Sequence, residues 1–331
     1  MRNVIWKTLL VKLPAIETKD NKNRKYYWNN MENKDQELTQ VADLRQSILD
    51  DIFKYFTDSR KKWLRSLIEP LVWFSANRFA GMAAKFDKNI TQFGLRQALS
   101  EFAAPFIQNV EIDGSEYIPQ NGPLLIVSNH PGAIDSIAIG ASLPRDDLNI
   151  MATRFPLLQR LPSASQRFIF IDPHAPVNLT GVRATISHLR SGGAVLIFPS
   201  GRVEPDPAIL PYARAALQNW SPSIELFLRK VPDTQVMVTI VSGVLSPIFL
   251  HNPLIHLWRG VRDPLAIAEV TQVVTQMLLK KHFRTKPRIS FDIPHTVSEL
   301  RRDYESAYHS ILAKASSLMT SHLPVAEAVA I

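Results

Sequence analysis

A histidine and an acid stand five residues apart in LLIVSNHPGAIDSIAIGASL, residues 124–143, a spacing that suits proton transfer. An apolar run ends at His130, a Pro-Gly turn follows, and Asp135 appears before apolar residues resume. A carboxylate bonded to one imidazole nitrogen fixes the tautomer and stabilises the imidazolium, which leaves the other nitrogen to take a proton. An acid at the start of a helix is also favourable without any catalytic role. Spacing alone leaves both interpretations open.

A second candidate cluster follows another apolar run, in GGAVLIFPSGRVEPDP, residues 192–207. The turn through Ser200, Gly201 and Arg202 would present a guanidinium, whose fork of donors can bind two phosphate oxygens at once. The same residues fit an ordinary surface turn equally well. Two further arginines beside apolar runs are candidates for the same anion-binding pocket, Arg154 and Arg167.

Composition limits the classes of protein that these clusters could serve. The chain has 331 residues, of which 46% are hydrophobic, enough for one large domain or a core domain with a smaller companion. Cysteine is absent, which excludes disulfides, thiolate catalysis and cysteine-ligated zinc. The net charge of +8 favours an anionic partner, such as an acidic membrane surface or a CoA-like substrate. Because the densest basic run is only RKKW, we do not expect nucleic acid.

After residue 108 the chain alternates between runs typical of strands and segments of helical length. The predicted strands are short aliphatic and β-branched runs bounded by Gly, Pro, Asn and Asp, at 109–119, 122–129, 148–153, 167–172, 193–199, 235–243 and 288–294. Helices are expected over 134–143, over 178–190 with Asn178 as N-cap, and over 297–319. This alternation predicts an α/β fold with a mostly parallel central sheet flanked by helices. Sites in such sheets gather at the carboxyl ends of the strands.

The residues before 109 predict a helical region. Apolar residues recur at three- and four-residue steps over 35–56, and 60–85 and 90–108 are also typical of helices, with Pro70 kinking or restarting the first of these two. The expected organisation is a flexible leader over 1–35, an N-terminal helical region over 36–108 and an α/β domain over 109–331. We expect no secretory signal, and Met31 is an alternative start.

Two segments suggest contact with a membrane. Residues 234–258 contain no Asp, Glu, Lys or Arg, but prolines and polar residues interrupt them, so we interpret them as a strand followed by an apolar loop or short helix. The second segment is WLRSLIEPLVWFSANRF, residues 63–79, which is rich in Trp and Phe. Ordinary core packing is the alternative for both. With the basic charge, they predict a peripheral or monotopic protein on the cytoplasmic face of a membrane.

In order and spacing, the motifs over about 109–245 resemble those of the glycerolipid acyltransferase superfamily, which includes 1-acyl-glycerol-3-phosphate and glycerol-3-phosphate acyltransferases. They are the HX4D motif from His130 to Asp135, a strand ending in Ile-Asp, a Phe-Pro-x-Gly turn and a further apolar strand. The resemblance implies that His130 is the general base and that Asp135 orients it. The acyl donor would be acyl-CoA or acyl-carrier protein, and the acceptor a lipid hydroxyl. No metal or cofactor is implied. The expected substrate-binding residues are Asn129, Arg154, Arg167, Ser200, Gly201 and Arg202.

The chain departs from the usual family pattern at three places. Pro173 stands where an Arg is usual, Ser200 where a Glu is usual, and Val241-Ser242 where a Pro is common. Because such charged residues help to hold the acceptor's phosphate, a lyso-aminolipid acceptor of the ornithine-lipid type is an alternative, as in the hemolysin-like branch that the Asn-His-Pro sequence resembles. A hydrolase with Ser200 as nucleophile and a non-catalytic lipid- or carrier-binding descendant are further alternatives.

Overall fold

The computed structural model describes residues 37–53, 62–172, 179–252, 264–283, 285–302 and 304–323, without the side chains of 62–68. The chain divides into two compact units, Met1–Gln40 and Val41–Ile331. The boundary between these units falls after Gln40. The leader expected over 1–35 lies outside the described residues.

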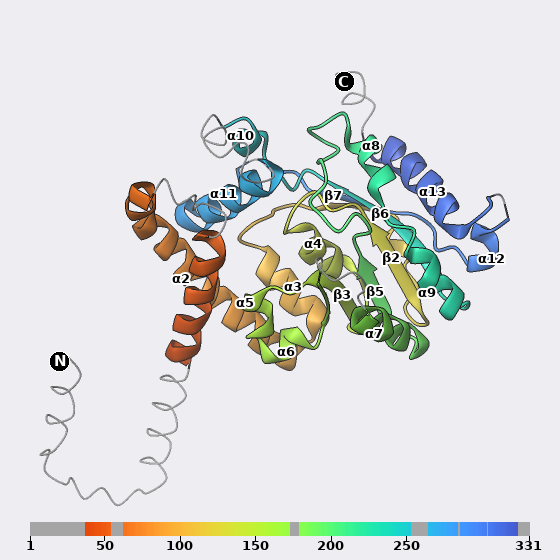
Figure 1. Ribbon diagram of the computed structural model, residues 1–331, viewed down its shortest axis with the longest axis horizontal. Coiled ribbons are helices and arrows are strands. Elements are labelled where there is room, and N and C mark those ends of the chain that lie inside the picture. The colour runs from red at the N-terminus through yellow and green to blue at the C-terminus, as the bar shows by residue number, and fades with distance from the viewer. Residues whose placement is uncertain are drawn as a thin grey trace, which may run out of the picture. The chain divides into compact units, whose positions relative to one another are not determined.

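A seven-stranded sheet forms the centre of the larger unit (Figure 1). Its strands are β1 (Glu111–Asp113), β2 (Leu124–Ser128), β3 (Leu148–Thr153), β4 (Phe168–Ile171), β5 (Ala194–Ile197), β6 (Gln235–Ser242) and β7 (Arg288–Phe291). The strand order is β1-β7-β6-β2-β5-β3-β4, and β6 and β7 are the antiparallel pair among otherwise parallel neighbours. Every strand lies within a predicted run, so the mostly parallel sheet is confirmed.

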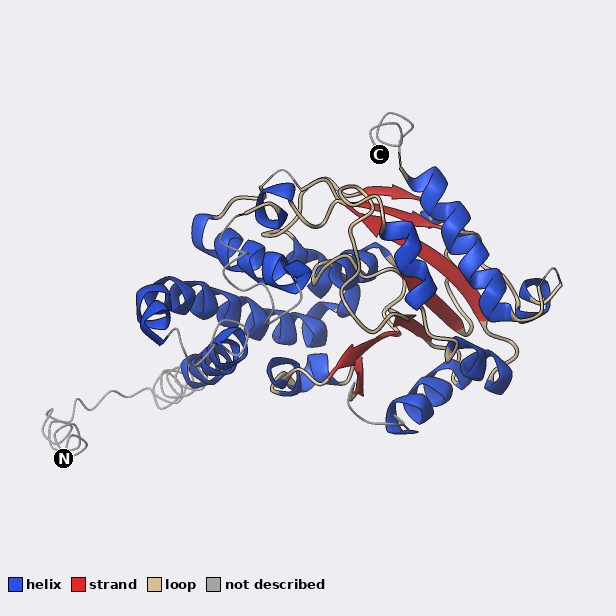
Figure 2. Cartoon of the chain, turned by 45° about the horizontal axis from the view of Figure 1, so that its top comes forward, coloured by secondary structure: helices blue, strands red, loops and turns tan. Residues whose placement is uncertain are grey.

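Helices cover both faces of the sheet (Figure 2) because its central strands are apolar on both sides. Leu124 and Ile126 of β2 pack with one group of helices, whereas Leu125 and Val127 pack with the other, and all four are fully buried. The first group is α2 (Lys62–Phe93), α3 (Leu95–Ala103) and α4 (Asp135–Ser142). The second group is α7 (Leu179–Arg190), α9 (Ile224–Lys230) and α13 (Ala307–His322). Packing on both faces of the sheet thus fixes β2.

Further elements complete the described part of the unit, and residues 37–53 are helical as well. These elements are the 3₁₀ turns η2 (Ser115–Tyr117) and η3 (Leu217–Asn219), and the helices α5 (Pro156–Gln159), α6 (Pro162–Ser165), α8 (Ala213–Ala216), α10 (Pro247–Leu250), α11 (Pro264–Leu279) and α12 (Val297–Leu300). Of the segment 234–258, residues 235–242 form β6 and 247–250 form α10, while 253–258 lie outside the described residues. In the described parts of the chain, no helix has both the length and the apolar character needed to span a bilayer.

Two helix boundaries differ from the predicted ones. α2 continues through Pro70 and ends at Phe93, because Gly94 takes a φ of 85°, where an added Cβ would lie 2.7 Å from Asp146 Oδ1. The single C-terminal helix expected over 297–319 is two helices, α12 and α13. A new helix starts at Ala307 because the side chain of Ser306 caps it, accepting a hydrogen bond from the backbone N–H of His309. The predicted N-cap Asn178 lies outside the described residues.

A buried histidine joins α13 to the sheet. His322 is 1% exposed, with Nδ1 2.8 Å from Ser290 Oγ and Nε2 2.7 Å from Ser242 Oγ. Burial lowers the pKa of His322 to about 4, the charge of Arg288 lowers it further, and Asp113 opposes both. The folded protein therefore holds this ring neutral at neutral pH.

We expect the free energy of unfolding to fall as the pH drops from about 6.5 to about 4, since the unfolded chain binds a proton there that the folded ring does not. The loss attributable to His322 is about 3 kcal/mol. Denaturant unfolding across this pH range checks it, as the difference between the wild type and His322→Gln. His309→Gln, an exposed position on the same helix, is the control. An identical pH dependence in the wild type and His322→Gln would contradict the assignment.

Candidate active site

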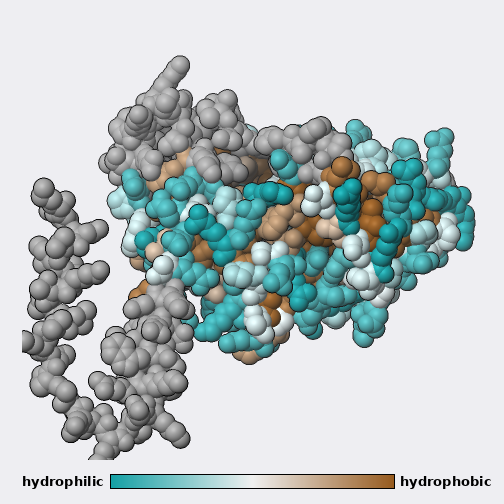
Figure 3. Space-filling model, turned by 60° about the horizontal axis from the view of Figure 1, so that its bottom comes forward, coloured by the Kyte–Doolittle hydropathy of each residue, from teal (hydrophilic) through white to brown (hydrophobic). Residues whose placement is uncertain are grey.

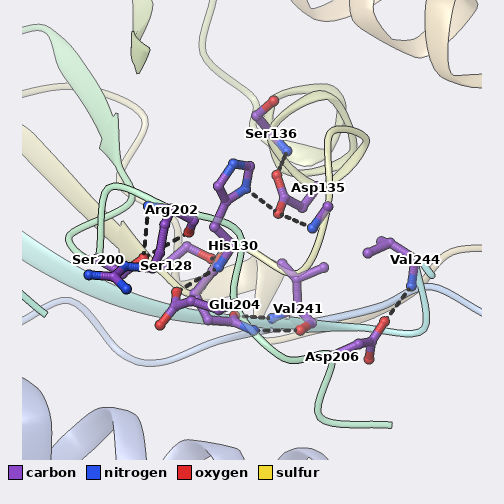
Figure 4. Close-up of polar contacts among 12 residues, drawn as sticks. Ser128, His130, Asp135, Ser136, Ser200, Arg202, Glu204, Asp206, Val241 and Val244 are labelled. Carbon is purple, nitrogen blue, oxygen red and sulfur yellow. Dashed lines mark hydrogen bonds and ion pairs between the residues drawn. The ribbon is translucent and has the colours of Figure 1, made fainter. Parts of the chain in front are cut away.

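The structure brings the predicted His-Asp pair together at the carboxyl edge of the sheet (Figure 4). β2 ends at Ser128, and His130 follows two residues later with its side chain 24% exposed. Its Nδ1 lies 2.7 Å from Asp135 Oδ2. When Nδ1–H donates to this carboxylate, the neutral ring carries its lone pair on Nε2. The pair therefore has the arrangement that a general base requires.

Local structure holds Asp135 in place as the first residue of α4. The backbone N–H of Asp135 lies 3.2 Å from the carbonyl oxygen of Gly132, so the chain curls back after the Pro-Gly turn. In return, Asp135 Oδ2 accepts from Gly132 N at 3.1 Å, and Oδ1 accepts from Ser136 N. The carboxylate is completely buried, yet it is satisfied by backbone donors and by the imidazole.

The imidazole of His130 binds its proton tightly. Phe198 stacks on the ring with centroids 4.4 Å apart and planes at 24°. Burial disfavours the charged ring, but the charge and hydrogen bond of Asp135, helped by the charges of Glu269 and Glu204, outweigh it and raise the pKa of His130 to about 9. His130 is therefore an imidazolium at neutral pH, and the proton-accepting form grows as the pH rises toward 9.

Asn129 has a different role from the substrate contact expected of it. Its side chain is 1% exposed and spans to β6, where Nδ2 donates to Val241 O at 2.9 Å and Oδ1 accepts from Val241 N at 2.8 Å. Both ends of the amide are engaged with backbone. Asn129 therefore ties the chain just before His130 to the neighbouring strand, a contact that the sequence did not predict.

Glu204 is a site residue that the sequence prediction missed. Its backbone N–H lies 2.7 Å from His130 O, and its Oε2 accepts from His130 N at 2.9 Å. Its Oε1 accepts from Trp220 Nε1 at 3.0 Å. Burial raises the pKa of Glu204 to about 7, against the effects of Trp220, His130 and Ser200. The sequence feature that could have identified Glu204 is its position in the second cluster, four residues after Ser200.

Asp206 fixes the loop that follows β6. Its carboxylate is fully buried and accepts from the backbone N–H groups of Gly243, Val244 and Leu245 at 2.9, 3.1 and 3.2 Å. Burial raises its pKa, and these hydrogen bonds oppose that shift. A Cβ built on Gly132 would lie 3.5 Å from Val244 Cγ2, so this loop packs against the turn between His130 and Asp135.

The predicted anion-binding residues divide between the two edges of the sheet. Arg154 directly follows β3 and is exposed at the same edge as His130. Arg167 directly precedes β4, which runs parallel to β3, so it lies at the opposite edge of the sheet from Arg154. The turn of Ser200, Gly201 and Arg202 follows β5 at the His130 edge.

The Ser200 turn is held by its own hydrogen bonds. The hydroxyl of Ser200 donates to Arg202 O at 3.0 Å and accepts from Arg202 N at 3.4 Å. Gly201 takes a φ of 64°, in the region that favours glycine. Arg202 is exposed, so its guanidinium is available to an anion at the same edge as the dyad. Pro173, the departure in the second motif, lies outside the described residues.

The comparisons with known proteins agree with the motifs. Residues 109–229, from β1 to α9, match the model of the family described as Acyltransferase. This segment is an acyltransferase-family domain. The resemblance inferred from the motifs over about 109–245 is thereby confirmed, and the dyad of His130 and Asp135 lies inside the matched residues.

The other comparisons add little for this acyltransferase-family domain. A search of curated proteins gives no match. Among solved structures, a similar one is described as the 1-acyl-sn-glycerophosphate (LPA) acyltransferase PlsC from Thermotoga maritima. It is 13% identical and covers 86% of this chain and 97% of that one, with a TM-score of 0.43. A TM-score of this size supports neither a shared activity nor a shared substrate.

We expect Asp135→Asn to lower the pKa of His130 from about 9, because it removes the principal charge that opposes burial. We expect the pKa of His130 to fall by roughly one to three pH units. NMR titration of isotope-labelled histidine measures it, with the His130 signal assigned from its loss in His130→Ala. Asp87→Asn, which alters a buried acid on α2, is the control. An unchanged His130 pKa in Asp135→Asn would refute this account of the dyad.

Proposed function

We propose that the protein is an O-acyltransferase that moves a fatty acyl group from an acyl thioester to a hydroxyl of a glycerol-phosphate or lysophospholipid acceptor. The thioester is acyl-CoA or acyl-carrier protein. The observation that carries the proposal is the 2.7 Å contact between His130 Nδ1 and Asp135 Oδ2 inside an acyltransferase-family domain. The pair lies at the sheet edge where α/β folds place their sites.

In the proposed mechanism, Nε2 of neutral His130 takes the proton of the acceptor hydroxyl while its oxygen attacks the thioester carbonyl. The new C–O bond forms as a tetrahedral intermediate, and its collapse breaks the C–S bond. The imidazolium then returns its proton to the leaving thiolate, so that the base is regenerated and an ester and a thiol are the products. Asp135 holds the ring through Nδ1 and stabilises its positive charge during the cycle. Holding both substrates together supplies much of the remaining acceleration.

Arg154 and Arg202 give the proposed acceptor site its cationic character. Both are exposed at the same sheet edge as His130. A phosphate or carboxylate on the acceptor would be held there by charge-assisted hydrogen bonds. This supports either a phosphate-bearing acceptor or a lyso-aminolipid, the alternative acceptor that the departures at Ser200 and Pro173 suggested.

We expect His130→Gln to lower kcat/KM for acyl transfer by about 10²- to 10⁴-fold, the usual contribution of a general base. The wild-type kcat/KM is expected to rise with pH, to be half-maximal near pH 9 and to reach its plateau above that, as the imidazolium loses its proton. The assay crosses acyl-CoA and acyl-carrier protein donors with glycerol 3-phosphate, lysophosphatidate and lyso-aminolipid acceptors, and product identity defines the acceptor class. His309→Gln is the matched control.

Three outcomes of that assay would overturn the proposal or redirect it. Undiminished transfer by His130→Gln would remove the base assignment. Thioester hydrolysis without transfer, with a fluorophosphonate adduct on Ser200, would indicate the hydrolase alternative, although the Ser200 hydroxyl donates to Arg202 O. Lipid or carrier binding without turnover of any donor and acceptor would indicate a non-catalytic descendant.

We also propose that the protein works as a peripheral or monotopic protein at a membrane surface. Large apolar side chains are exposed on α2 and α10, at Leu71 (51%), Trp73 (45%), Phe74 (50%) and Ile248 (60%). α11 packs against both of these helices, so they belong to one region of the larger unit. Figure 3 shows apolar residues reaching the surface among polar ones on the face that it draws. Such side chains can enter the headgroup region, where the net charge of +8 favours anionic lipid.

We expect Leu71→Ser combined with Phe74→Ser to weaken binding to anionic liposomes by roughly tenfold or more, since two exposed apolar side chains leave the lipid. Flotation with vesicles of stated anionic content, at low and high salt, measures the bound fraction. Phe93→Ser is the control because it is 53% exposed near the other end of the same helix. Equal binding by all three proteins would exclude this surface as the contact.

A further inference from the structure

We propose that Glu204 is a positioning residue for acyl transfer, one that fixes His130 through its backbone and places a second buried acid at the end of β2. The inference rests on the proposed role of His130 as the base. It assigns to Glu204 a task that neither its position in the sequence motif nor the pairing of His130 with Asp135 implies. Glu204 touches no reacting atom and acts through His130.

The backbone of His130 is held on both sides by this one residue. Glu204 N–H donates to His130 O at 2.7 Å, and His130 N–H donates to Glu204 Oε2 at 2.9 Å. The two bonds close a ring between the end of β2 and the loop after β5. His130 therefore cannot shift along the sheet edge without breaking a bond to a buried carboxylate, which is costly.

The far side of Glu204 is anchored in the core. Its Oε1 accepts from the indole N–H of Trp220 at 3.0 Å, and Trp220 is 1% exposed. The carbonyl oxygen of Trp220 in turn accepts from the hydroxyl of Tyr308 on α13 at 2.7 Å. The backbone after Trp220 also returns to the site, because Ser221 N–H donates to Pro199 O at 3.1 Å. These contacts make Glu204 a rigid support.

Glu204 also contributes electrostatically. The charges of Asp135, Glu269 and Glu204 all raise the pKa of His130. Charges interact strongly where water is excluded, and Glu204 is only 3% exposed. When His130 takes the proton of the acceptor, an ionised Glu204 would stabilise the resulting imidazolium, alongside the direct bond to Asp135.

The two acids differ in how they act, so their variants should differ too. Asp135 bonds the ring itself and selects its tautomer. Glu204 bonds two N–H donors, one from His130 and one from Trp220. A glutamine at 204 offers a single acceptor oxygen, and its NH₂ group would face the second donor. Glu204→Gln therefore removes the charge and half of the support, whereas Glu204→Asp keeps the charge but shortens the reach.

The first measurement is independent of turnover. NMR titration of labelled histidine gives the pKa of His130 in the wild type, Glu204→Gln, Glu204→Asp and Asp87→Asn. We expect the proton affinity of His130 to fall roughly three- to tenfold in Glu204→Gln and to change less in Glu204→Asp. Asp87→Asn is a matched control, because the buried Asp87 also accepts from two N–H groups, Ser163 N at 2.8 Å and Ala164 N at 2.7 Å, and lies on α2.

The second measurement is kinetic, on folded protein whose stability has been measured in parallel. We expect kcat to fall about tenfold or more in Glu204→Gln with KM changed little, and the rising limb of the kcat/KM profile to move to lower pH. Glu204→Asp should retain the position of the limb and lose part of kcat. Asp87→Asn should lower the stability but leave kcat and the position of the rising limb unchanged.

The outcomes separate this inference from the proposed function. If His130→Gln loses transfer while Glu204→Gln keeps the wild-type kcat, His130 pKa and pH profile, Glu204 is only structural and the inference is wrong. If transfer is absent from the wild type, the proposed function fails. The His130 titration then still decides whether Glu204 acts on the imidazole. The positioning role would also be overturned if Asp87→Asn showed the same loss of kcat, the same loss of stability and the same pH profile as Glu204→Gln.

Discussion

A partly buried histidine stays charged only when its attraction to nearby acids exceeds the cost of losing hydration. The site at the carboxyl end of β2 depends on that balance. Burial acts against the imidazolium of His130, while three acids act for it and raise its pKa to about 9. One of them, Asp135, is completely buried and survives there because two backbone N–H groups and the imidazole satisfy it. Removing any member would leave a buried charge or donor without its partner.

The sheet makes this balance possible by fixing backbone rather than side chains. β2 is buried on both faces, so packing holds its carboxyl end in place. Asn129 ties that end to β6, and Asp206 ties the loop after β6 to the loop after β5. The acids at the site therefore act on a preorganised frame, which costs no reorganisation when charge develops during reaction.

The sequence predicted the fold well because its signals were local. All seven strands and α4 and α7 lie within or close to predicted segments, since aliphatic runs bounded by turn residues mark buried strands. The pairing of His130 with Asp135 was predictable for the same reason, as a turn of few residues joins them. The distance of Arg167 from the His130 edge depends on the direction in which β4 runs in the sheet. The contacts of Asn129 with Val241, and of Glu204 with Trp220, depend on strand order and loop path, which no local pattern encodes.

The path of the loop after β5 explains how a motif lacking its usual glutamate still brings an acid to the histidine. Ser200 stands at the position where the resembled family has that residue. From there the chain runs outward through the exposed Gly201 and Arg202, and then returns inward to the buried Glu204. Two residues of this loop thereby have opposite surroundings, because Arg202 is exposed to solvent while Glu204 is buried against the backbone of His130. In a straight strand, residues two apart lie on the same face, so Arg202 and Glu204 would be similarly exposed. Gly201, with its φ of 64°, turns the chain immediately before Arg202, and the irregular backbone that follows carries Glu204 back to the end of β2.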